Sequence, residues 1–175
     1  MEDNQSRSSR HIEGETMSIG STESSHPLLS HADGLAASSA DAFLLVGRVL
    51  LGWLFLASSA GIGGKLWNHA GFVGYLKNLG APAPEFSSWI GALVEFVIGL
   101  SLVLGVGTRY AALLCALFLI AATALAHRYW EYPAAQMGNQ YNHFLKNLAV
   151  FGGALILFVA GPGRFSVDRM LSKKG

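Results

Sequence analysis

Long apolar segments separated by short polar ones follow each other along the chain from about residue 42. The clearest pair is residues 86–106 and 110–127, and across residues 86–127 only Glu95 and Arg109 carry a full charge. A helix rises about 1.5 Å per residue and the hydrocarbon core of a bilayer is about 30 Å thick, so each segment can cross it. The pattern therefore predicts a transmembrane helical hairpin.

Two further apolar segments complete the pattern. Residues 42–62 predict a first span, with Asp41 or Ser39 as its N-cap, and the last span is predicted from about Asn142 to Ala160. Residues 128–143 then form an aromatic and polar loop. The sequence predicts an all-α integral membrane protein, a four-helix antiparallel transmembrane bundle.

A short helix is expected between the first and second spans. Its residues are mixed: an apolar stripe alternates with lysines, a histidine and aromatic side chains, and Pro82 and Pro84 end it. The stripe consists of Leu66, Val73, Leu76 and Leu79. Such a pattern is typical of a helix that lies on the membrane surface.

The two ends of the chain differ from this middle part. Residues 1–40 are polar and rich in serine, with too little apolar mass to offset the entropy of ordering, so a disordered tail is expected. Residues 41–170 hold the transmembrane domain, and residues 171–175 form a basic end.

Composition supports a membrane protein and excludes several classes. The 175 residues are 51% hydrophobic and 13% charged, with 21 glycines, which is typical of membrane helices. A net charge of +1 gives no case for a nucleic-acid partner. The single cysteine, Cys115, excludes an internal disulfide and a CxxC redox pair.

The distribution of basic residues predicts the orientation. Four spans place both termini on one side of the membrane, and more lysines and arginines fall on that side than on the other. The excess marks the cytoplasmic face, so both termini are expected in the cytoplasm. The terminal side carries Arg109, Arg164, Arg169, Lys173 and Lys174, and the other side carries Lys65, Lys77 and Arg128.

Arg48 and Glu95 are the charges placed inside predicted spans, where ionisable residues are candidates for function. Gly91 and Gly99 share one helix face with Glu95, so that carboxylate is expected to face another helix. At about 1.5 Å per residue, Glu95 lies roughly 13 Å and Arg48 roughly 21 Å from the outer ends. A proton-linked or quinone-binding pair is one interpretation; a structural ion pair or a snorkelling arginine is the other.

A second group of polar residues gathers at the outer ends of the spans. It consists of Lys65, His127, His143, Lys146 and Asn147. Such a cluster could hydrogen-bond a quinone carbonyl or exchange protons. Polar residues at a membrane interface explain it equally well, and a metal site is not predicted because a complete ligand set is missing.

Several blocks closely resemble the DoxX family of small bacterial membrane proteins, over about residues 43–169. They read GKLWNHAGFVGYLKNLGAPAP, VEFVIGLSLVLGVGTRYAALLCALFLIAATALAHRYW and HFLKNLAVFGGALIL, in the family's order and spacing. The resemblance implies a four-helix membrane bundle, a bacterial cytoplasmic (inner) membrane location and an association with membrane oxidoreductase systems.

Two functions are consistent with these features. The first is an accessory subunit of a quinone-linked oxidoreductase system, without a redox centre of its own, that works with soluble or membrane oxidoreductase subunits. The second is a small transporter or scaffold protein with no redox chemistry. No covalently bound cofactor is implied; quinone is the candidate ligand, the lipid bilayer is the expected surrounding, and a homo-oligomer is a further option.

Overall fold

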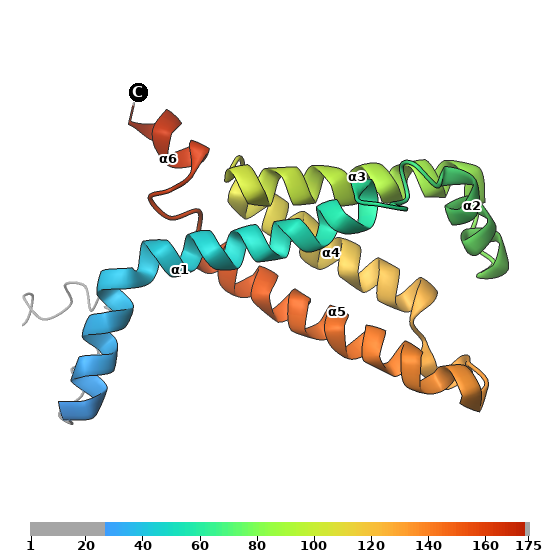
Figure 1. The fold of residues 1–175 in the computed structure, drawn as a ribbon, viewed down its shortest axis with the longest axis horizontal. Helices are drawn as coiled ribbons and strands as arrows, with labels where there is room; N and C mark the ends of the chain where they lie inside the picture. Colours follow the sequence, from blue (N-terminus) through green and yellow to red (C-terminus); the bar gives the residue numbers. More distant parts are fainter. Residues whose placement is uncertain (1–26, 174–175) are drawn as a thin grey trace, which may run out of the picture. The chain divides into compact units, whose positions relative to one another are not determined.

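The structure is a computed structural model that describes residues 27–173. These residues are helical and contain no strand (Figure 1). The helices are α1 (Pro27–Ala60), α2 (His69–Asn78), α3 (Pro84–Leu104), α4 (Thr108–Ala126), the 3-10 turn η1 (Tyr129–Glu131), α5 (Ala134–Ala160) and α6 (Val167–Ser172). Four helices in this range are long and apolar enough to cross a membrane, so the predicted all-α, four-span class is confirmed.

Two helices begin earlier than the sequence predicts. Helix α1 begins at Pro27, so neither Ser39 nor Asp41 is its N-cap. Residues 35–40 hold three alanines, which favour continuation of a helix. Helix α5 begins after Pro133, at Ala134, and takes up most of the predicted polar loop. Proline readily precedes the first turn of a helix, and the following residues include good helix formers.

The chain divides into two compact units, residues 1–38 and 39–175. In the first unit the structure describes residues 27–38, which are helical where a disordered tail is expected. Residues 1–26 of that predicted tail, together with Lys174 and Gly175, lie outside the described residues.

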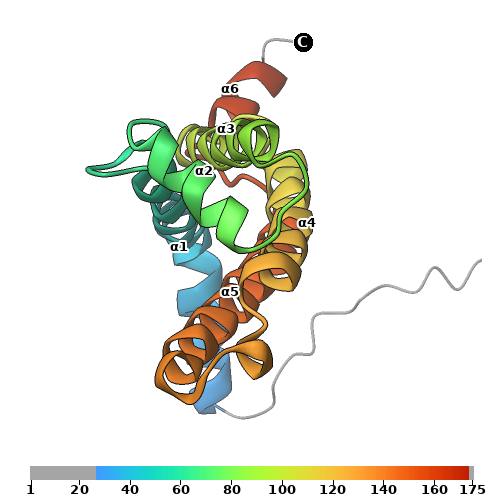
Figure 2. The ribbon, with the colours of Figure 1, turned by 90° about the vertical axis from the view of Figure 1, so that its right-hand side faces the viewer.

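The second unit is built around the hairpin of α3 and α4. Helix α4 packs against α3 on one side and α5 on the other, and α2 packs against α3 (Figure 2). Helix α1 crosses α3 at close range, since a Cβ atom added to Gly52 would lie 2.7 Å from the carbonyl oxygen of Gly99. The predicted hairpin is therefore the centre of the bundle.

Small side chains fill the interior of the helix contacts. Ala112, Ala116 and Cys115 on α4 are buried. Many large apolar side chains point outward instead, among them Leu93, Val97, Leu117, Ile120 and Ile156. A soluble domain rarely exposes so many, whereas lipid tails would cover them.

The predicted short helix is present as α2, and Leu76 of its apolar stripe is buried. An exposed ion pair joins Lys77 of α2 to Glu85 of α3, with the two charged groups 2.7 Å apart. That this helix lies on the membrane surface stays a prediction.

Candidate functional site

Glu95 lies in the middle of α3 and forms an ion pair with Lys65, which follows α1. The Lys65 ammonium donates a hydrogen bond to Oε1 of Glu95, whose residue is only 5% exposed. The Lys65 nitrogen also lies 5.0 Å from the centre of the Phe72 ring, a cation–π distance. Gly91 faces Phe72 and Gly99 faces α1, so Glu95 points into the bundle as the glycine spacing predicts.

Arg48 does not pair with Glu95. It is 1% exposed and donates hydrogen bonds to the carbonyl oxygens of Leu102 at 2.8 Å and Val103 at 3.2 Å. A third bond reaches the carbonyl oxygen of Phe165 at 2.6 Å. The last carbonyls of a helix lack intrahelical partners and lie at the negative end of its dipole, so they attract a cation. Arg48 therefore ties the C-terminal end of α3 to the C-terminal segment of the chain.

Asp168 makes further contacts at this end of the bundle. Its carboxylate accepts hydrogen bonds from the backbone N–H groups of Gly107 at 2.7 Å and Thr108 at 2.8 Å, at the start of α4. Partial burial acts to raise the pKa of Asp168, but these backbone bonds and the charge of Arg48 outweigh it and lower that pKa. Gly105 has φ 72°, and a Cβ there would meet the Arg48 guanidinium, so glycine is required between the helices.

Three members of the predicted outer cluster, His127, His143 and Lys146, form a connected group where α4 and α5 adjoin, whereas Lys65 pairs with Glu95 instead. His127 Nδ1 lies 2.8 Å from Oε1 of Gln140, and the rings of His127 and His143 stack with centres 5.0 Å apart. Lys146 Nζ lies 3.4 Å from Nδ1 of His143. Three of the residues singled out in the sequence are thus neighbours in space.

Asn147, the next member of the predicted cluster, has a structural contact. Its side-chain amide donates to the Thr123 hydroxyl at 3.0 Å, which joins α5 to α4. Among the described residues, no three His, Cys, Asp or Glu side chains gather closely enough to hold a metal ion.

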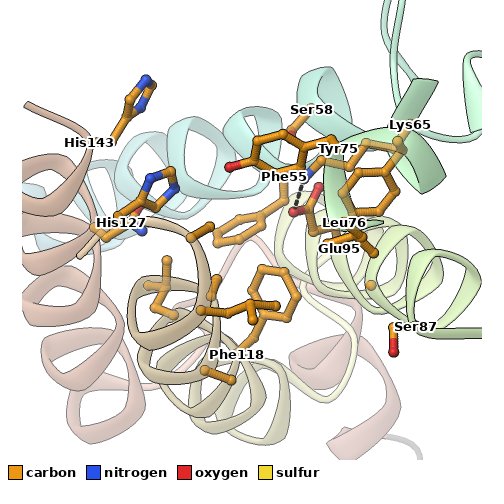
Figure 3. A pocket seen from close by; sticks show the side chains of 18 of the residues that line it. Phe55, Ser58, Lys65, Tyr75, Leu76, Ser87, Glu95, Phe118, His127 and His143 are labelled. Atoms are coloured by element: carbon orange, nitrogen blue, oxygen red, sulfur yellow. Dashed lines mark hydrogen bonds and ion pairs between the residues drawn. The ribbon is translucent and has the colours of Figure 1, made fainter. Parts of the chain in front are cut away.

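A cavity of about 740 Å³ is lined both by the Lys65–Glu95 ion pair and by the group of His127, His143 and Lys146 (Figure 3). All five members of the predicted outer cluster line it, and so does Glu95, whereas Arg48 does not. Five helices line the cavity, and its walls are mainly apolar. Helix α5 contributes only polar residues. Helices α1 to α4 supply the apolar and aromatic ones, which include Leu54, Phe55, Phe72, Tyr75, Leu76, Phe86, Ile90, Phe118, Leu119 and Leu125. Phe55 and Phe118 meet edge to face, 6.2 Å between ring centres, and also join the core.

Several lining residues were not singled out in the sequence. The sequence predicts Asn139 and Gln140 in a loop, but they lie on α5 and continue the helical stripe of His143, Lys146 and Asn147. Their spacing of three and four residues could have revealed a longer α5. The aromatic walls carried no comparable signal, because aromatic residues are common in any membrane helix.

Tyr75 is the one phenol among the lining residues. It lies on α2, outside the spanning helices, and its pKa is raised by burial and, less strongly, by the neighbouring Tyr132. The phenol therefore stays protonated at neutral pH and keeps an O–H group to donate.

Comparisons with known proteins agree with this architecture. The chain matches the DoxX family over residues 43–128. It is 34% identical to inner membrane protein YqjF of Escherichia coli K12, over 77% of this chain and 95% of that protein. It is 30% identical to inner membrane protein YphA of the same organism, over 72% of this chain and 88% of that protein.

A third relative is the uncharacterized membrane protein Rv3486 of Mycobacterium tuberculosis H37Rv, 31% identical over 89% of this chain and 93% of that protein. No solved structure matches the chain. Four spanning helices and these relatives together show that the chain belongs to the DoxX family and is a small multi-pass inner membrane protein.

Proposed function

We propose that this protein is an accessory subunit of a quinone-linked membrane oxidoreductase system and that its outer cavity binds the quinone. The observation that carries the proposal is the cavity itself. Its walls are mainly apolar. Its polar groups come from the Lys65–Glu95 ion pair and from the neighbouring residues His127, His143 and Lys146. Small-molecule sites commonly have this composition and a volume of about 300–1,000 Å³, which includes the volume here.

The lining residues suit the two parts of a quinone. Aromatic and aliphatic side chains such as Phe55, Phe118 and Leu125 offer surface for the ring and its apolar tail. The Lys146 ammonium and the protonated Tyr75 phenol are hydrogen-bond donors, and quinone oxygens are acceptors. In this proposal the electrons are carried by the quinone and by partner subunits.

The test is quinone titration of the protein in nanodiscs, comparing the parent with His143→Ala combined with Lys146→Ala. We expect at least about tenfold weaker binding, since a hydrogen bond to a charged group contributes roughly 1.5–3 kcal/mol. Neither residue belongs to the apolar core, so the helices should stay folded. Circular dichroism checks this.

The matched control is Gln136→Ala combined with Asn142→Ala. Both residues are exposed polar residues of α5 that do not line the cavity, so quinone affinity should not change. Unchanged binding in the His143 and Lys146 variant, or no binding by the parent, would contradict the proposal.

The second candidate function is a transporter or scaffold without redox chemistry. Arg48 bears on this alternative: it does not line the cavity, and its three hydrogen bonds hold this chain's own helices and C-terminal segment together, which disfavours a transport passage along Arg48. Loss of assembly of a membrane complex on deletion of this protein, with normal quinone content and turnover in the remaining complex, would support it.

A further inference from the structure

Glu95 has one carboxylate oxygen that the protein leaves unsatisfied. Oε1 accepts the hydrogen bond from Lys65, while Oε2 is buried and has no hydrogen-bond partner among the described residues. Glu95 lines the cavity, and Figure 3 shows its carboxylate joined to Lys65. A buried acceptor without a donor is unfavourable, and native proteins rarely leave one.

The missing partner of Oε2 must be a donor. An ionised carboxylate accepts hydrogen bonds and cannot donate them. The Lys65 ammonium needs no further partner from the protein or a ligand, because its side chain is 28% exposed and its remaining N–H groups can bind water. Oε2 itself has almost no exposed surface, so a ligand reaches it only when the carboxylate of Glu95 turns towards the cavity that this residue lines. The group that Oε2 then requires is an N–H or O–H, and a carbonyl oxygen would be repelled from it.

We infer that the cavity recognises a hydroxyl-bearing ring, and that it binds the reduced, quinol form of its ligand in preference to the quinone. This inference rests on the proposed function, because it specifies the form of the ligand that the same cavity takes. The quinol hydroxyl donates to Oε2 of Glu95. The quinone carbonyl at the same position would face that oxygen with no proton between them.

The test compares three ligands that share the same substituted ring and tail on the parent protein in nanodiscs, without oxygen. They are a decyl-tailed benzoquinol, its quinone and the O,O-dimethyl ether of the quinol. The ether keeps the aromatic ring but has no O–H group. The quinol should bind about tenfold or more tightly than both others, the range expected for a hydrogen bond to a charged group.

A substitution tests the residue itself. Glu95→Gln keeps the size of the side chain but adds an N–H₂ donor, so the preference for quinol should fall below about threefold. Glu85→Gln, on the exposed first turn of α3, is the matched control and should keep the parent's preference. The comparison of three ligands on the parent stands even if Glu95→Gln folds poorly.

The redox potential offers an independent measurement. Tighter binding of the reduced form raises the midpoint potential of a bound two-electron couple, by about 30 mV for a tenfold preference. Equal affinities for all three ligands, or an unchanged preference in Glu95→Gln, would overturn this inference and leave quinone binding intact. Binding of none of the three would overturn the proposed function, and this inference with it.

Discussion

Arg48 shows how a buried cation can be structural within a membrane helix. All three of its hydrogen bonds go to backbone carbonyls, two in the last turn of α3 and one at Phe165. Arg109 acts in a similar way at the end of α5, where it donates to the carbonyl oxygen of Val159 at 3.0 Å. Carbonyls at helix ends need such donors wherever water is scarce.

Replacing Arg48 by methionine should lower the stability of the bundle markedly. The change leaves the carbonyls of Leu102 and Val103 without their donor in a buried place, and we expect a loss of about 3 kcal/mol. Thermal unfolding of detergent-purified protein measures the effect. Arg164→Met is the control, because the Arg164 side chain is 76% exposed. Equal melting temperatures for parent and Arg48→Met would contradict the structural role.

Asp168 should make the stability depend on pH in the acid range. Its pKa in the folded protein lies below the ordinary value of 3.8. Its contribution is therefore complete above the unfolded pKa and is lost as the pH falls through the lower, folded pKa. Asp168→Asn should be less stable than the parent near pH 7, and the difference should shrink as the pH approaches about 3.

The measurement is the melting temperature of both proteins across this range. Glu131→Gln, which removes an exposed carboxylate from an ion pair with Arg128, is the control and should show little difference at either pH. A gap between parent and Asp168→Asn that stays constant down to pH 3 would contradict the assignment.

At the scale of the elements, the crossing of α1 and α3 depends on two glycines that let the backbones meet. A Cβ atom on Gly99 would lie 2.8 Å from the backbone nitrogen of Leu56 and 2.9 Å from the carbonyl oxygen of Gly52. Small residues permit such close approach in membrane helices. The Leu56 side chain also lies 2.8 Å away, but because two of the three nearest atoms belong to the backbone, the helices would have to move apart.

Gly99→Ala should therefore destabilise the bundle by about 2 kcal/mol, the usual range for overpacking. Gly152→Ala on α5 is the matched control, since nothing lies within 4 Å of a Cβ there. That control should be neutral or slightly stabilising, because alanine favours helix more than glycine does. Thermal unfolding in detergent compares the two variants. Equal melting temperatures for Gly99→Ala and Gly152→Ala would argue against a tight crossing.

At the scale of the whole second unit, the two ends of the bundle differ. At one end Arg48, Arg109 and Asp168 bind helix ends and the C-terminal segment, and Asp41 accepts a hydrogen bond from the backbone N–H of Arg164 at 2.7 Å. At the other end the cavity separates the helices and polar side chains line it. The closed end holds the fold together, and the hollow end is the candidate binding site.

The closed end should face the cytoplasm, since it carries the excess of basic residues. A reporter that works only in the cytoplasm should be active when fused after Gly175. The same reporter inserted after Trp130, in the connection between α4 and α5, should be inactive. The reverse pattern of reporter activity would show the opposite orientation, with the cavity towards the cytoplasm.

The fold class follows from the sequence alone. Apolar segments of bilayer length can satisfy their backbone only as helices, and tight connections make consecutive helices antiparallel. This is why the sequence predicts that residues 65, 127, 143, 146 and 147 lie at the same end of the bundle, and all five line the cavity.

Tertiary structure decided which charges meet. Spacing places Glu95 and Arg48 inside spans, but only the packing shows that Lys65 reaches Glu95 and that Arg48 binds the end of α3. It also decided that Asn139 and Gln140 belong to a helix and line the cavity. Side-chain partners depend on helix rotation and crossing, which are set by contacts between residues far apart in the chain, and no local pattern records those contacts.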